Sequence, residues 1–431
     1  MDYLNLDRII VKNNIIKYVF SYSNGISKFF SGKPFFIEYP ELIDNVPESI
    51  LAIPFVCNVL PIIWLTDSIL EIDEIDKSFY ESIPEFEQGY IDMYPNVRFG
   101  GEIRVKKIID NSYSDTGKSA MFYSGGLDSA STLVSHFDEK PDLLSVWGSD
   151  IRFDNESGWK IVHAAINEAA ERFKLKEAVF RSTFREFDNE GKLHEEFLNV
   201  LGDGWWHGIK HSLALLGHVA PYTFIHKITK MYIASTLCKD YGFATCASVP
   251  EVDNRVEFSS CKVFHDGYKF SRQDKANNVV SFCNSNNTFI NLHVCWISQT
   301  GSNCCMCEKC YRTIANLWAE GGEFKKFGFD CGEQELKMIP NCISKLSPEA
   351  KMQMYWWKDI QKRVKENIKE LKHKPYYSYF RWIIKADFDY PESISKERTK
   401  PFKRLRSSLS KKGLYRKLHI IKVNQKNEVN S

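Results

Sequence analysis

The sequence predicts an α/β protein: a parallel sheet with helices on both faces, preceded by an α+β region and followed by a helical one. Three observations support this fold class. Short apolar segments alternate with segments of helical period between residues 116 and 320. Segments rich in Ile, Val and Phe, separated by turn residues, precede them. Long, highly charged segments with apolar residues at helical spacing follow.

The alternation of predicted strands and helices lies in the middle region, 116–320. Apolar runs at 143–147, 177–180 and 231–234 read as strands. Val162, Ile166, Ala169 and Phe173 recur at the spacing of one helix face, and the run from Leu213 to Val219 does the same. Ligands of such folds bind at the carboxyl ends of the strands, which is where we expect the functional residues.

The first region, 1–115, is predicted to be an accessory α+β domain. Its expected strands are 9–11, 15–20, 35–39 and 103–109. The apolar block 51–65 contains Pro54 and Pro61 and is too short to span a membrane, so it is predicted to be buried core. No catalytic constellation is visible here.

The third region, 321–431, is predicted to be helical, with a long helix near 350–371. Its end, 396–431, holds twelve Lys and Arg against Glu397 and Glu428. Nucleic-acid binding is therefore an option for this basic tail alone, because the chain as a whole has a net charge of only +2.

Composition narrows the class of protein further. The chain has 431 residues, 43% of them hydrophobic, which suits two or three globular domains. It starts without the basic and apolar segments of a signal peptide, so a cytoplasmic protein is expected. Twelve cysteines in such a protein are not expected to form a disulfide framework.

The hexapeptide 124–129, Ser-Gly-Gly-Leu-Asp-Ser, is the strongest local signal. It joins a short apolar strand, 120–123, to a segment of helical period. Two adjacent glycines let the backbone approach an anion closely, and the following helix adds its positive end. Ser124 and Ser129 add hydroxyl groups, while Asp128 could hold a cation, with magnesium the best candidate. The pattern predicts a phosphate site without a lysine in the loop.

This hexapeptide resembles the SGGxDS pyrophosphate loop of the N-type ATP pyrophosphatases, the PP-loop superfamily. The resemblance implies that residues Ser124, Gly125, Gly126, Leu127, Asp128 and Ser129 bind ATP while a substrate atom attacks the α-phosphate. Thr116-Gly117-Lys118-Ser119, just upstream, has the look of a Walker loop. We discount it because it precedes a strand and has Ser112 where the first glycine is needed.

Four cysteines are spaced as metal ligands: Cys295, Cys304, Cys307 and Cys310, in the pattern C-x8-C-x2-C-x2-C. We expect Cys295 to end a strand, 290–296, and the others to open a helix. Four thiolates leave no open position, which favours structural zinc over catalytic zinc; an iron–sulfur cluster is the alternative. His293 could replace one ligand, and Cys305 is expected to be a bystander.

The loop and the cysteine pattern together resemble the 7-cyano-7-deazaguanine synthase family over about residues 118–318. That resemblance implies an adenine nucleotide α-hydrolase-like fold, a structural zinc, and a ligase that activates a carboxylate with ATP and transfers it to ammonia. Where the family has an Arg-Asn pair, this chain has Lys210-His211, and its segment 251–255 differs as well. The ATP chemistry is therefore expected to transfer better than the deazaguanine substrate, and we expect a divergent member.

Four further residues are candidates for the chemistry. Lys210 could bind phosphate or the substrate carboxylate, or lie on a surface-facing helix turn. Arg272 and Lys275 could neutralise the α-phosphate during transfer, or belong to a solvated charge run. Ser235, after the strand 231–234, is expected near the nucleotide.

The expected function is an ATP-dependent carbon–nitrogen ligase with ATP, Mg²⁺ and Zn²⁺, a small carboxylate as substrate and an external ammonia donor. A tRNA-thiolating enzyme and an ATP-binding sensor or scaffold without turnover are the alternatives. A homo-oligomer stays open, and no membrane span is expected.

Overall fold

The computed structural model describes residues 1–242, 244–295, 297–298, 300–347, 350–391 and 394. The basic tail 396–431 lies outside these residues. The described chain is an α/β structure in which one mixed sheet of eleven strands runs through the first two predicted regions. The α/β class is confirmed at this level.

The strand order is β10-β11-β9-β6-β7-β8-β3-β2-β1-β4-β5. The five strands from β11 to β8 in this order are parallel, as the alternation of strands and helices predicts. The strand bounds are β1 Tyr3–Lys12, β2 Ile15–Tyr22, β3 Phe35–Glu38, β4 Ile69–Asp76, β5 Glu102–Ile109, β6 Ser119–Phe122, β7 Asp142–Trp147, β8 Glu177–Ser182, β9 Lys230–Ala234, β10 Glu257–Phe258 and β11 Cys261–Asp266.

Two segments far apart in sequence join the N-terminal strands to the parallel part. β3 pairs antiparallel with β8 through Ile37 with Ser182 and Glu38 with Arg181. β1 to β3 are antiparallel, and β4 and β5 continue the sheet in parallel beyond β1. The sheet is therefore continuous between residues 1–115 and the region of the glycine loop.

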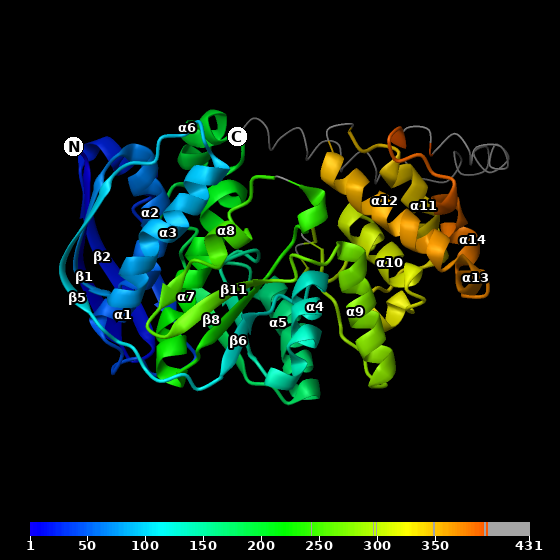
Figure 1. Cartoon of the computed structure of the whole chain (residues 1–431), viewed down its shortest axis with the longest axis horizontal. Coiled ribbons are helices and arrows are strands. Elements are labelled where there is room, and N and C mark those ends of the chain that lie inside the picture. Colours follow the sequence, from blue (N-terminus) through cyan, green and yellow to red (C-terminus); the bar gives the residue numbers. More distant parts are fainter. Residues whose placement is uncertain (243, 296, 299, 348–349, 392–393, 395–431) are drawn as a thin grey trace.

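Helices connect and cover the strands (Figure 1). The α-helices are α1 Glu48–Leu51, α2 Ile53–Thr66, α3 Lys77–Met93, α4 Leu127–Ser135, α5 Glu156–Phe173, α6 Glu190–Leu201, α7 His211–His226, α8 Pro250–Asp253, α9 Arg272–Ser285, α10 Glu308–Ala319, α11 Glu333–Ile343, α12 Lys351–Glu366, α13 Ile368–Leu371 and α14 Tyr377–Phe380. A π-helical turn, Trp206–Lys210, leads directly into α7.

Alternate residues of the central strands supply two different cores. Ala120 and Leu144 join the large core with α2 and α7, whereas Met121 and Leu143 join the core of α4 and α5. This is the period of two expected for a sheet covered on both faces. The alternation places α4, and the loop that precedes it, against the sheet.

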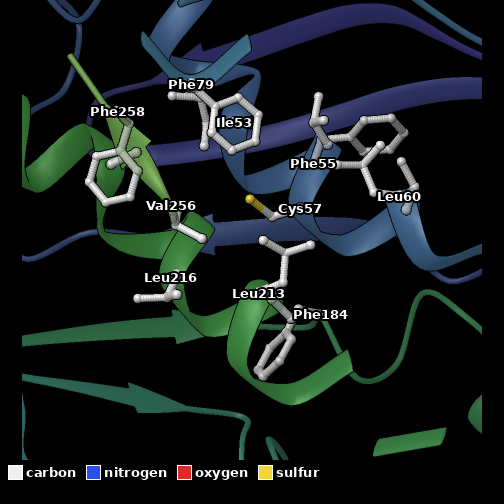
Figure 2. Close-up of a cluster of buried hydrophobic side chains, with 14 of the residues drawn as sticks. Ile53, Phe55, Cys57, Leu60, Phe79, Phe184, Leu213, Leu216, Val256 and Phe258 are labelled. Atoms are coloured by element: carbon white, nitrogen blue, oxygen red, sulfur yellow. The ribbon is translucent and has the colours of Figure 1, made fainter. Parts of the chain in front are cut away.

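The block 51–65 is the centre of the large core, as the sequence predicts. It forms α2, whose residues from Ile53 to Trp64 are all buried. Figure 2 shows Cys57 of α2 among apolar side chains from α7 and β10. Gly217 of α7 allows this close approach, because a Cβ there would lie 2.7 Å from the Cβ of Cys57.

A third core joins α4 to the C-terminal helices. It contains Leu127 and Ala130 of α4 together with residues of α9, α10, α11 and α12. In Figure 1, α9 to α12 lie toward the end of the molecule opposite β1, β2 and β5, and α4 lies nearer the middle. The predicted helical region after residue 321 is thus confirmed for the described residues.

One predicted strand is wrong. Residues 290–295 are irregular, because their backbone groups bond to a loop and to the end of a 3-10 helix, Phe324–Phe327, instead of to a neighbouring strand. Leu292 N–H donates to Phe327 O and His293 N–H donates to Gly125 O. Among the described helices, none is both long enough and apolar enough to cross a membrane.

Candidate functional site

The glycine loop lies where the sequence predicts, at the carboxyl end of β6 and the start of α4. Gly125 has a φ of +72°, a left-handed conformation that favours glycine. Gly126 is the N-cap of α4, so the first N–H groups of the helix point into the loop. Ser124 is exposed and Gly126 half-buried, whereas Gly125 between them is buried.

The two serines of the loop contact each other and the backbone. Ser124 Oγ accepts from Gly126 N–H at 3.3 Å and lies 3.3 Å from Ser129 Oγ. Ser129 Oγ donates to Gly126 O. Behind the loop, His293 N–H donates to Gly125 O at 2.7 Å. His293 therefore supports the glycine turn.

Asp128, in the first turn of α4, faces two cations of α9. Arg272 Nη1 donates to Asp128 Oδ2 at 2.9 Å, and Lys275 Nζ lies 3.3 Å from Oδ1. Burial raises the pKa of the Asp128 carboxyl, but the charges of Lys275, Arg272 and Lys309 outweigh it and lower the pKa overall. Asp128 is therefore held as a carboxylate between cations.

The start of α9 is fixed by its own capping residues. Ser271 and Asp274 form a reciprocal capping box, which places Arg272 and Lys275 in the first turn. Arg272 Nη2 donates to Thr313 of α10, and Lys275 Nζ donates to the carbonyl of Ser235. Both side chains are almost fully buried, so they do not belong to a solvated charge run.

Ser235 is brought to this cluster by its backbone. Its hydroxyl donates to Leu237 O, and its N–H donates to Asp266 O at 2.8 Å. Ser235 contributes its carbonyl oxygen to the site, where it accepts the hydrogen bond from Lys275 Nζ. Ser235 therefore lies beside Lys275, and its hydroxyl is already used locally.

Two cations of α10 join the site, and sequence reasoning missed both. Lys309 acts electrostatically on both Asp128 and Arg272, and burial, followed by the charge of Arg272, lowers its pKa. Arg312 has its Nε and Nη1 buried without a hydrogen-bond partner among the described residues. The signal that could have found them is their position: Lys309 lies between two of the spaced cysteines, and Arg312 follows the last of them.

The guanidinium of Arg312 is positioned by contact with an aromatic ring more than by its ion pair. Its guanidinium lies 3.7 Å from the ring centroid of Trp356 of α12, and its Nη2 lies 3.6 Å from Glu308. Burial lowers the pKa of Arg312 to about 9. The described residues thus gather four cations, Arg272, Lys275, Lys309 and Arg312, around Asp128 and Glu308, and the carboxylates of Asp150 and Asp266 act on Lys309 and Lys275.

The four spaced cysteines come together, as predicted, in the part of the chain that the structure describes. The sulfurs of Cys295, Cys304, Cys307 and Cys310 all lie within 4.8 Å of one another. Two of the pairs are 4.0 and 3.9 Å apart. A tetrahedral zinc with bonds of about 2.3 Å separates its sulfurs by about 3.8 Å, so the cluster fits one such ion.

The backbone around the cluster is suited to thiolates. N–H groups of Ser298, Met306 and Cys310 donate to three of the sulfurs at 3.3 to 3.4 Å. Cys307 is also the N-cap of α10. Neither His293 nor Cys305 belongs to the group of four. A metal such as zinc could therefore be held here, and it would position the first turn of α10 with Lys309.

Lys210 is not brought to this site. It ends the π-helical turn, fully buried, with its ammonium 2.6 Å from Asp188 and 3.2 Å from Glu190. It also donates to Phe184 O. Arg185 pairs with Glu190 at 2.7 Å, so this second cluster holds two cations and two carboxylates. Neither sequence interpretation of Lys210, a substrate ligand or a surface-facing turn, matches this environment.

No protein-family model matches the chain, and comparisons with curated proteins and with solved structures likewise find no match. The arguments about function therefore rest on the geometry of the chain itself.

Proposed function

We propose that the chain is an ATP-dependent ligase that adenylates a carboxylate and transfers the acyl group to ammonia or another amine. In this proposal the domain of residues 116–320 is an adenine nucleotide α-hydrolase-like unit of the PP-loop type. The main support is the cluster around Asp128. Four largely buried cations lie beside a glycine loop at a helix N-terminus, and Arg272 Nε and Arg312 Nε and Nη1 are buried without a hydrogen-bond partner among the described residues.

The buried guanidinium nitrogens without a hydrogen-bond partner are what point to an anion. Burying unpaired cations is costly, so a cluster of this kind is stabilised when an anion completes it. The Lys210 cluster provides the contrast, because its two cations are matched by Asp188 and Glu190. A triphosphate offers the oxygen atoms that these unpartnered donors of Arg272 and Arg312 need.

Each residue then has a specific task. The N–H groups of the loop and the first turn of α4 hold the outer phosphates. Arg272 and Lys275, oriented by Asp128, stabilise the charge that develops on the α-phosphate when the carboxylate attacks it. The attack forms the acyl–phosphate bond and breaks the bond to pyrophosphate; an amine then displaces AMP.

Magnesium fits Asp128 less well than the sequence suggests. Both carboxylate oxygens already face cations, so an ion there would have to displace Arg272 or Lys275. In the proposed mechanism Asp128 therefore orients these two side chains. The magnesium ion that accompanies ATP would offset the charge of the phosphates and be held mainly by them.

ATP binding is the first test, because it needs no knowledge of the acid. Titration calorimetry should show that Arg272→Gln and Lys275→Gln each weaken ATP binding by about 10- to 100-fold, the range for lost hydrogen bonds to charged groups. Arg104→Gln, an exposed arginine of β5, is the matched control and should bind ATP as the unmodified protein does. Unchanged binding in both site variants would refute the nucleotide site.

Turnover is the second test. Purified protein with ATP, Mg²⁺ and ammonia is incubated with a panel of small carboxylic acids, and AMP is measured. AMP that depends on one acid, and that Asp128→Asn abolishes, supports the ligase. AMP that depends on tRNA would instead indicate the thiolating alternative, and tight ATP binding without AMP under either condition would indicate a sensor.

A further inference from the structure

The helix α12 packs against the candidate nucleotide site, although it lies outside the region 116–320 that holds the glycine loop. It contacts both α9 and α10, the two helices that supply the cations. The Cζ of Arg312 lies over the ring of Trp356, 3.7 Å from its centroid. Trp357 Nε1 donates to Glu308 Oε1 at 3.0 Å. Both contacts reach the beginning of α10.

The start of α9 is bound by α12 as well. Arg363 Nη2 donates to Asp274 Oδ1 at 2.9 Å, and Asp359 Oδ2 accepts from Gln273 N–H at 3.3 Å. Asp274 belongs to the capping box of α9. Arg363 Nη1 donates to Glu320, the C-cap of α10, at 2.6 Å. Side chains of α12 therefore join the first turn of α9 to α10.

The contact at Arg312 uses the flat face of the guanidinium. The N–H groups of a guanidinium point outward in its own plane, so an aromatic ring against its face leaves them free to donate. Nε and Nη1 of Arg312 are buried and have no hydrogen-bond partner among the described residues. Its Nη2 lies 3.6 Å from Glu308, which is too far for a hydrogen bond. Trp356 thus positions the group and leaves its donors available.

A second guanidinium in the chain that lies over an indole provides a contrast. Arg185 Cζ is 3.9 Å from the ring centroid of Trp206. Its Nε and Nη2 donate to Glu190 at 3.0 and 2.7 Å, and its Nη1 donates to Ser149 O at 3.2 Å. The donors of Arg185 are used within the protein, whereas two nitrogens of Arg312 are not. The free donors of Arg312 therefore call for acceptors from a ligand.

Arg312 adjoins the residues of the proposed nucleotide site. Thr313, the next residue of α10, accepts from Arg272 Nη2 at 3.1 Å, and Arg272 pairs with Asp128 at 2.9 Å. The charges of Arg272 and Asp128 both act on Arg312. Nε of Arg272 is also buried without a hydrogen-bond partner among the described residues. Two guanidinium groups on neighbouring helices thus have free donors close to the first turn of α4.

We propose that Trp356 is a positioning residue of the nucleotide site: it holds the guanidinium of Arg312 so that Nε and Nη1 bind phosphate oxygens of ATP. This role rests on the proposed function and deepens it, because it gives Arg312 a ligand and makes α12 a part of the site. Guanidinium donors suit phosphate oxygens, and their hydrogen bonds are stronger where water is excluded.

A double-mutant cycle tests whether Trp356 acts through Arg312. ATP binding to the full-length protein is measured by titration calorimetry for Trp356→Met, Arg312→Gln and the double variant. Arg312→Gln should weaken binding by about 10- to 100-fold, the range for lost hydrogen bonds to charged groups. Trp356→Met should weaken it by about 3- to 30-fold, the range for a desolvated cation–π contact. In the Arg312→Gln background, Trp356→Met should change affinity by less than about twofold.

Two further variants separate positioning from folding. Trp356→Phe keeps an aromatic face and should bind ATP within about threefold of the unmodified protein. Trp206→Met is the matched control, because it removes the same kind of contact from Arg185, and ATP binding should stay unchanged. The melting temperature of each variant is measured in parallel. If Trp356→Met does not fold, the cycle is completed with Trp356→Phe, whose smaller loss should also disappear in the Arg312→Gln background.

The outcomes distinguish the role of Trp356 from the nucleotide site itself. Weaker ATP binding in Arg272→Gln, with unchanged binding in Arg312→Gln and Trp356→Met, would overturn the role of Trp356 and leave the site standing. The same loss from Trp356→Met with and without Arg312, or an equal loss in Trp206→Met, would overturn it too. Unchanged ATP binding in both Arg272→Gln and Lys275→Gln would refute the nucleotide site and this role together.

Discussion

At the scale of single residues, the two buried ion clusters show how neighbours decide the role of a charge. Asp128 and Lys210 are both charged side chains with partners of opposite sign. Around Asp128, nitrogens of Arg272 and Arg312 are buried without a hydrogen-bond partner among the described residues, which leaves donors for an anion. Around Lys210, two cations pair with two carboxylates, so the cluster needs no further ion. The presence of unpartnered cation nitrogens, more than burial itself, separates the two clusters.

Lys210→Met should therefore destabilise the fold without affecting the nucleotide site. It leaves Asp188 buried without its cation, a change that costs about 3 to 5 kcal/mol in comparable cases. Chemical denaturation should show this loss, and ATP affinity of the folded variant should be unchanged. Lys192→Met, which removes an exposed pair with Glu195, should alter stability by less than about 0.5 kcal/mol. Lost ATP binding in a stable Lys210 variant would restore its role as a ligand.

His218 predicts a pH dependence of stability. It is fully buried between Ala214 O and Ser182 Oγ, and burial lowers its pKa to about 4. The unfolded chain, with a pKa near about 6.5, binds the proton more readily. The neutral form thus contributes stability that is present above about pH 6.5 and is lost as the pH falls toward 4.

The shift corresponds to about 3 kcal/mol between these two pH values. Unfolding free energies measured in denaturant at pH 7 and pH 4.5 should differ less in His218→Gln than in the unmodified protein. An identical difference in both proteins would contradict a lowered pKa for the buried imidazole of His218.

At the scale of elements, α10 connects the metal cluster to the candidate nucleotide site. Cys307 caps this helix, and Lys309 and Arg312 follow within its first turns. The order of the chain therefore ties the position of both cations to the geometry of the four cysteines. We expect the metal to act on the nucleotide site through this helix, without contact with ATP.

Cys307→Ser should release the metal and lower stability, because three ligands hold a structural zinc less well than four. Metal content by mass spectrometry should fall from one ion per chain, and the melting temperature should fall with it. Cys305→Ala is the matched control. Cys305 is adjacent to Cys304 in sequence but lies outside the group of four, so this variant should keep the metal. A metal-free variant with unchanged melting would refute a structural role.

Gly217 tests the packing of α7 on α2. Gly217→Ala would place a methyl group 2.7 Å from Cys57 Cβ and 3.1 Å from the Cα of Pro54, so the helices would have to separate. We expect a loss of about 1 to 3 kcal/mol of unfolding free energy. Gly191→Ala in α6 meets only Asn189 Oδ1 at 3.6 Å and should be neutral or slightly stabilising. Equal effects at both positions would argue against close packing at α2.

At the scale of the whole molecule, one core spans the N-terminal strands and the parallel part of the sheet. Phe35 of β3 stacks on Phe187 at 4.5 Å, and Tyr39 Oη donates to His218 O. These contacts cross the boundary predicted near residue 115. The continuous sheet and its shared core suggest that the two parts depend on each other for stability.

Hydrogen exchange measured by mass spectrometry should show this coupling. Amides of β2 and of β8 should lose protection at the same denaturant concentration, because both strands pair with β3. Amides of α10 and α12, which belong to a different core, serve as the internal comparison. Loss of β2 protection well before that of β8 would instead indicate that residues 1–115 unfold separately.

Features encoded over short stretches could be predicted without the structure. The glycine loop, the spacing of four cysteines and the periodicity of strands and helices depend on neighbours in sequence, and the described residues bear out their placement. Tertiary structure decided which charges meet. Lys309 and Arg312 join Asp128, Lys210 pairs with Asp188, and residues 290–295 bond to the glycine loop and to Phe327, because each of these partners comes from another segment of the chain. Local geometry is set by adjacent residues, whereas the electrostatic environment of a site is set by whatever the fold places beside it.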